Sequence, residues 1–84
     1  MYKMNQPVRI LQKEKDIFLL SVPRTGLRAE INKNVADFLA FIQEKDIIEA
    51  AVAEEYSSEK NIENVEDYKV LFEEMVKEKV LIEF

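Results

Sequence analysis

The stretch that decides the fold is residues 17–42, IFLLSVPRTGLRAEINKNVADFLAFI, because its hydrophobic periodicity changes once, near residue 32. Before that point the pattern is typical of β-strands, and after it apolar residues follow the 3.6-residue period of a helix. Ile17 to Val22 is apolar on both faces and is expected to be the central strand of a sheet. Leu27 to Ile31 alternates apolar and polar residues, which predicts a further strand. Pro23 and Gly26 favour a tight turn between the two.

Toward the N-terminus, Val8 to Gln12 has the alternation of another short strand, and the polar residues 13–15 connect it to the central strand. Two short connections in succession predict an antiparallel meander, in which the first and third strands are the edges of the sheet. Residues 1–7 contain no long apolar run, and we expect this segment to be flexible.

Helices are predicted for the remainder of the chain. Asn32 is a good N-cap, and the helix after it has its apolar residues on one face: Val35, Phe38, Leu39 and Ile42. Asp46 is expected to start a second helix, with Glu49 as its capping-box partner.

A third helix is expected from about Ile62 to Lys77, capped by Asn61 or Asn64. Its apolar residues span roughly 180° of the helix surface, which is wider than the ~100° that one core face requires. The apolar tail, residues 80–84, is expected to pack back on the core. Because the apolar stripe of this helix is wider than the core requires, part of it is left to pack against the tail or to line a groove.

These elements predict one α+β domain over residues 1–84, with a three-stranded antiparallel sheet followed by three helices. A sheet of three strands cannot bury its face alone, so the helices must cover it. The short link at residues 43–45 makes the helical part resemble a helix-turn-helix, and the sheet takes the place of a wing. The expected architecture is therefore winged helix-turn-helix-like.

The composition argues against catalysis. The chain has no Cys and no His, which removes disulfides, thiol nucleophiles and the commonest general base. Its single Gly cannot build a phosphate-binding loop. The 17 Asp and Glu residues fit solvated helix faces better than a metal site, because no calcium-loop pattern is present. We expect no catalytic residue, no metal and no cofactor. The absence of a signal peptide or membrane-spanning run predicts a cytoplasmic protein that binds no membrane.

Three binding functions remain open. A winged helix suggests DNA, but a formal charge of −5 and scattered cations oppose contact with phosphates, so we expect no nucleic-acid partner. A structural or dimerising subunit is a further alternative. The favoured function is capture of an extended peptide as an added strand on the open third strand, beside the wide third helix.

Several segments resemble the PqqD-like family, whose members are recognition elements for ribosomally made, post-translationally modified peptides. The resemblance is carried by INKNVADFL at 31–39, IFLL at 17–20 and the segment from Ile47 to Tyr56. LFEEMV at 71–76 is similar to the closing stretch of the family. The chain departs from the family pattern at Lys79, where the family has a late glycine, and at residues 43–46, where Asp-Gly is frequent.

The resemblance implies binding of the leader segment of a precursor peptide and its delivery to a modifying enzyme such as a radical maturase, a cyclodehydratase or a leader peptidase. The leader would pair antiparallel with the third strand, at Leu27, Arg28, Ala29, Glu30 and Ile31. The side chains expected to line a groove on the third helix are Val65, Tyr68, Lys69, Phe72 and Met75. A proline at Ala29 is expected to remove a backbone donor from this strand.

Overall fold

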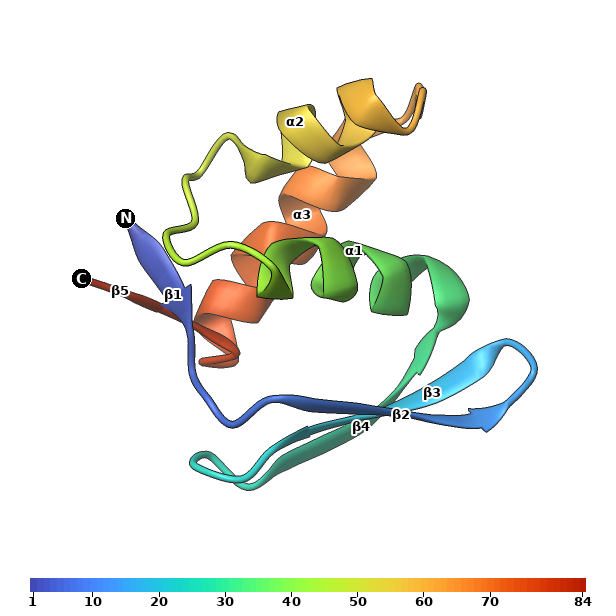
Figure 1. Cartoon of the computed structure of the whole chain (residues 1–84), viewed down its shortest axis with the longest axis vertical. Coiled ribbons are helices and arrows are strands. Elements are labelled where there is room, and N and C mark those ends of the chain that lie inside the picture. The colour runs from blue at the N-terminus through green and yellow to red at the C-terminus, as the bar shows by residue number, and fades with distance from the viewer.

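The computed structural model describes all residues 1–84. The elements run in the order β1 Tyr2–Met4, β2 Arg9–Glu14, β3 Ile17–Val22, β4 Leu27–Asn32, α1 Lys33–Gln43, α2 Val52–Glu59, α3 Val65–Lys77 and β5 Leu81–Glu83. Strands β2, β3 and β4 form an antiparallel sheet in that order, and the three helices lie on one side of it (Figure 1). The predicted α+β class is confirmed, with its three-stranded sheet followed by three helices.

The sheet follows the alternation in the sequence closely. β3 has the predicted bounds and lies in the centre of the sheet, where Leu20 and Val22 are buried. β2 continues to Glu14, past the predicted end, so the turn to β3 shortens to two residues, 15 and 16. Gly26 has a φ of 76°, which explains why the β3–β4 turn needs a glycine.

The step from sheet to helix occurs at Asn32, as the sequence predicts. Its side-chain oxygen accepts a hydrogen bond of 2.9 Å from the backbone N–H of Val35, which caps α1. The face of α1 that follows is buried: Phe38, Leu39 and Ile42 are fully excluded from solvent. This cap fixes the direction in which α1 leaves β4 and crosses the sheet.

The second helix begins at Val52, so the predicted start at Asp46 is wrong, and Glu49 is not a capping-box residue. A long-range contact replaces the predicted first turn. The backbone N–H of Tyr2 donates to the Ile48 carbonyl at 2.8 Å, and the Ile48 N–H donates to the Tyr2 carbonyl at 2.9 Å. Ile48 is fully buried in this position. Burial of its side chain outweighs a local cap that would stabilise a helix by about 1 kcal/mol.

The two ends of the chain form a second, two-stranded sheet. Residues 2–4, which the sequence places in a flexible segment, form β1 and pair antiparallel with β5 in the C-terminal tail. Met4 and Leu81 are register partners, and both side chains are buried. The third helix starts at Val65 rather than near Ile62, because the Ile62 N–H bonds to the Ser57 carbonyl at 2.8 Å within the α2–α3 connection.

Lys79, two residues past the end of α3, has a backbone conformation that favours glycine. Its φ is 63°, and the N–H of Val80 bonds back to the Met75 carbonyl at 2.9 Å, which is the Schellman pattern of a helix C-terminus. We expect Lys79→Gly to raise the free energy of unfolding by about 0.5–1 kcal/mol, because glycine adopts this conformation without steric cost. Urea denaturation followed by circular dichroism measures the change. Glu73→Gly, at an exposed position inside α3, should instead lower stability by about 1 kcal/mol, and a loss at both positions would contradict this explanation.

Candidate functional site

The outer edge of β4 has no strand beside it. β4 pairs with β3 on one side, and the small β1–β5 sheet lies elsewhere in the molecule (Figure 1). In an antiparallel pair, residues alternate between those that bond to the neighbouring strand and those that direct their N–H and C=O away from it. The backbone groups at this edge are therefore available to an added strand.

The two-residue turn between β2 and β3 shows which residues of β4 face outward. Glu14 and Ile17 close this turn as a hydrogen-bonded pair, so Ile17 bonds toward β2. By alternation, Leu20 bonds toward β4, and its partner there is Ala29. The backbone groups of Arg28 and Glu30 consequently point to the open edge.

This register corrects the expected role of Ala29. Its N–H bonds within the sheet, so a proline at Ala29 would break the β3–β4 ladder and would not test the open edge. Glu30 is the correct position for that test, because a proline on an edge strand is tolerated where its N–H would face outward.

A surface hollow of about 360 Å³ lies where β4 passes into α1, opposite α3. We call it the β4–α3 hollow. Its floor and walls are largely apolar, with polar groups at its rim. The residues that line it are Asn32, Asn34 and Val35 on the β4–α1 side and Asp67, Tyr68, Val70, Leu71 and Glu74 on α3.

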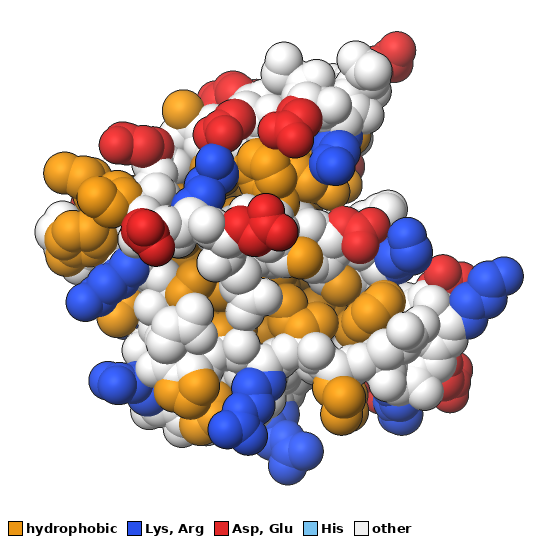
Figure 2. Space-filling view, viewed as in Figure 1, with side chains coloured by type: hydrophobic (Ala, Val, Ile, Leu, Met, Phe, Trp, Pro, Cys, Tyr) orange, Lys and Arg blue, Asp and Glu red, His pale blue; other side chains and the backbone are white.

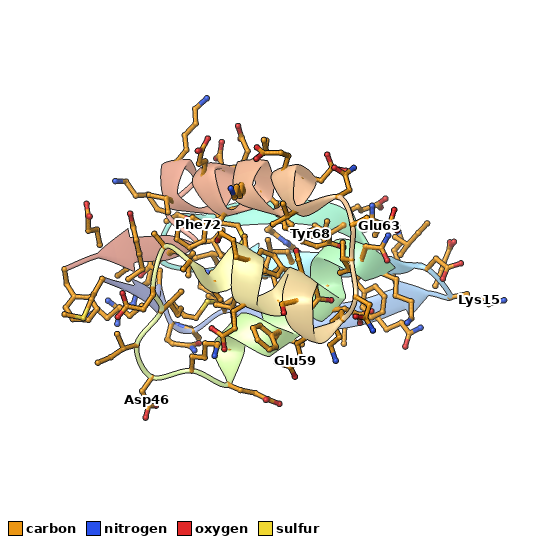
Figure 3. All side chains as sticks on the ribbon, turned by 90° about the horizontal axis from the view of Figure 1, so that it is seen from above. Lys15, Asp46, Glu59, Glu63, Tyr68 and Phe72 are labelled. Atoms are coloured by element: carbon orange, nitrogen blue, oxygen red, sulfur yellow. The ribbon has the colours of Figure 1, made fainter.

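Of the α3 residues predicted to line a groove, only Tyr68 lines this hollow. Phe72 and Met75 are 6% and 4% exposed, belong largely to the core and do not line this hollow. Phe72 and Lys69 instead line a separate depression between α2 and α3. Val65, at the start of α3, is half-buried and is not part of the hollow. Figure 3 shows Tyr68 and Phe72 on the side of α3 that faces the other elements.

Lys69 faces α2 and not the hollow. Its ammonium lies 3.2 Å from a carboxylate oxygen of Glu54 and 3.5 Å from one of Glu66. A backbone hydrogen bond and the Lys69 ammonium together hold the pKa of Glu54 below its ordinary value. The hydrogen bond that the Lys69 ammonium donates to Glu54, with the charge of Glu66, raises the pKa of Lys69. This pair links α2 to α3, and its exposure to solvent limits its contribution to stability.

Tyr68 is held in a cluster of aromatic rings. Its ring centroid lies 5.1 Å from that of Phe38, in an edge-to-face arrangement, and 5.3 Å from that of Tyr56. Burial raises the pKa of the Tyr56 phenol, with smaller contributions from Tyr68 and Asp37. Edge-to-face pairs of this kind each add about 0.5–1.5 kcal/mol beyond the area buried. The wall that Tyr68 presents to the hollow is therefore fixed before any ligand arrives.

Val70 lines the hollow but was not among the residues predicted from the sequence; it is the most exposed large apolar side chain of α3, at 55%. Successive residues of a helix lie about 100° apart, which places Val70 about 160° from Phe72 around the helix. Val70 is therefore separate from the core face. An isolated apolar residue opposite the core face was the available sequence signal for this side of α3, together with its neighbours Asp67, Leu71 and Glu74.

The predicted β4 residues divide by face. Leu27, Ala29 and Ile31 are half-buried toward the helices, whereas Arg28 and Glu30 are exposed. Glu30 forms an ion pair of 2.8 Å with Lys13 of β2 across the sheet. Arg28 makes no ion pair. It is the one free charge on this strand.

No three acidic side chains converge into a group that would hold a metal ion. None of the helices combines the length and the apolar character needed to cross a bilayer. The site consists of an open strand edge beside a partly apolar hollow, an arrangement that can bind an extended chain. In the comparisons with known proteins, no family model, no curated protein and no solved structure matches this chain.

Proposed function

We propose that this chain is a non-catalytic peptide-binding domain, which captures the leader of a ribosomal precursor peptide as an added strand on β4. The observation that carries the proposal is the unpaired edge of β4 next to the β4–α3 hollow. Strand addition takes its affinity from main-chain hydrogen bonds and its specificity from pockets for alternate side chains. The open edge of β4 offers the main-chain hydrogen bonds, and the β4–α3 hollow offers a pocket for a side chain.

The hydrogen-bonding part of the site is short. The outward N–H and C=O groups of Arg28 and Glu30 offer two donors and two acceptors, and a peptide residue opposite each would pair with them. A single such bond contributes about 0.5–1.5 kcal/mol net. Four bonds alone give modest affinity, so the hollow has to supply the remainder.

The hollow suits an apolar side chain of the peptide. Val35, Tyr68 and Leu71 present apolar surface there, and each is already half-buried. Burial of one Leu- or Phe-sized side chain contributes about 1.5–3 kcal/mol. Asp67 and Glu74 at the rim would favour a basic or polar residue beside that apolar one.

In the proposed role, the domain acts with a separate modifying enzyme in the cytoplasm, of the maturase, cyclodehydratase or leader peptidase class. It would raise the effective concentration of the precursor at that enzyme without performing chemistry itself. The short connections and the fixed aromatic wall support a preformed receptor, which loses little entropy on binding.

Selection from a display library of 20-residue random peptides, followed by titration of the selected synthetic peptides, tests the proposal. We expect backbone amide shifts to concentrate at residues 28–35 and 67–74. Glu30→Pro should weaken binding about tenfold, because it removes an outward donor and the bond to it. Glu30→Ala, which keeps the N–H, should have an effect of about twofold or less.

Val70→Glu tests the hollow independently and should also weaken binding about tenfold by placing a charge beside apolar surface. Ile47→Glu is its matched control, because Ile47 is 52% exposed and lies outside the hollow. If Glu30→Pro and Glu30→Ala bind equally well, pairing along β4 is not the mode of binding.

A further inference from the structure

The face of the β2–β3–β4 sheet that points away from the helices is not covered by any element of the chain (Figure 1). We call it the outer face. Leu20 and Val22 are buried toward the helices, so their neighbours Leu19 and Ser21 point the other way. The register places Leu11 beside Leu19 on this face, and Leu11 is 67% exposed.

Two arginines flank this apolar pair. Arg9 and Arg28 are the register partners of Ser21 from either side, so their backbones lie about 10 Å apart across the sheet. Neither arginine makes an ion pair. Together with Leu11 and Leu19 they line a depression of about 250 Å³.

The acidic residues are distributed unevenly along the chain. Residues 33–84 contain fourteen of the seventeen acidic residues, whereas residues 1–32 contain three of them and six of the twelve Lys and Arg. Figure 2 shows the acidic side chains mainly over the helices and basic ones along the lower margin, where the sheet lies. The cations are thus divided evenly between the two parts of the chain, and residues 1–32 carry a net formal charge of +3 because few acidic residues lie there.

We propose that the outer face docks an acidic segment of a partner protein. An apolar side chain of that segment would lie on Leu11 and Leu19, and carboxylates on either side would bind Arg9 and Arg28. Guanidinium groups suit this task because they bind carboxylates with two parallel hydrogen bonds. Lys13 is already paired with Glu30, which leaves the two arginines as the available cations of this face.

This site shares only Arg28 with the peptide site: the backbone of Arg28 lies at the open edge of β4, whereas its side chain lines the depression on the outer face. The β4–α3 hollow lies on the helix side of the sheet, and none of the residues lining it lines the depression on the outer face. The domain can therefore hold one ligand at the edge of β4 and a second at the outer face. Such an arrangement would suit an adaptor that brings two molecules together.

A synthetic seven-residue peptide of alternating glutamate and leucine, titrated at low salt while backbone amide shifts are recorded, tests the proposal. We expect shifts at residues 9–11, 19–21 and 28, and affinity that falls as salt is added. The Arg9→Ser/Arg28→Ser double variant should bind about tenfold more weakly. Arg24→Ser removes an exposed arginine outside the outer face and should change affinity about twofold or less.

The variant Val70→Glu separates this proposal from the proposed function, since it disturbs only the hollow and should leave binding of the acidic peptide unchanged. A counterpart peptide with glutamine in place of glutamate should bind about tenfold more weakly. The proposal is overturned by equal affinity for the two peptides, by no binding at millimolar concentration, or by shifts confined to α3. Shifts that appear on raising the protein concentration alone would assign the face to a second copy of this chain and also overturn it.

Discussion

Replacing Phe38 by alanine is expected to lower the free energy of unfolding by about 3–5 kcal/mol. Phe38 is fully buried in α1, and its ring centroid lies 5.0 Å from that of Tyr56 and 5.1 Å from that of Tyr68. The substitution leaves a cavity between all three helices and removes two aromatic contacts. A chain of 84 residues has a free energy of unfolding of about 4–12 kcal/mol, so the substitution removes a large part of it.

Urea denaturation followed by circular dichroism measures the Phe38→Ala effect. Phe84→Ala is the matched control, because it removes the same side chain where that side chain is 61% exposed. Its only aromatic interaction is with the Lys3 ammonium, 5.7 Å from the ring centroid, so we expect a loss of about 1 kcal/mol or less. Similar losses at the two positions would mean that Phe38 does not occupy the centre of the core. Because Phe38 supports Tyr68, its loss should also loosen the wall of the β4–α3 hollow.

Leu81→Ala is expected to lower the free energy of unfolding by about 2–5 kcal/mol, although Leu81 lies only three residues before the last residue of the sequence, Phe84. Its side chain is fully buried. Its strand β5 pairs with β1, which lies at the opposite end of the sequence. The small sheet formed by the termini is therefore part of the core. The same denaturation experiment measures the loss.

Glu83→Ala is the control for Leu81→Ala, because Glu83 lies in the same strand with its side chain in solvent. Its effect should stay within about 0.5 kcal/mol. A Leu81→Ala loss as small as that of the control would show that β5 is not packed on the remainder of the domain. The β1–β5 sheet would then be a frayed addition to the fold.

The candidate site was predictable from the sequence only in part. The alternation of Leu27 to Ile31 identified the strand and its place at the edge of the sheet. The surplus apolar width of α3 pointed to a groove but assigned Phe72 and Met75 to it, and both are in the core. Periodicity shows which residues share a face, but it does not show which face meets the core and which meets a neighbouring strand.

Local interactions account for what the sequence determined about this protein. The strands Ile17–Val22 and Leu27–Asn32 and the cap at Asn32 depend on alternation and on hydrogen bonds between near neighbours, and such signals are complete within a few residues. Tertiary structure alone decided where α2 starts and that β1 pairs with β5. It also decided which apolar residues of α3 face the core and which line the β4–α3 hollow. In each case a contact between distant segments, such as Tyr2 with Ile48, outweighed a local preference. Burial of a whole side chain contributes more free energy than one cap or one turn, so distant contacts prevail wherever the two conflict.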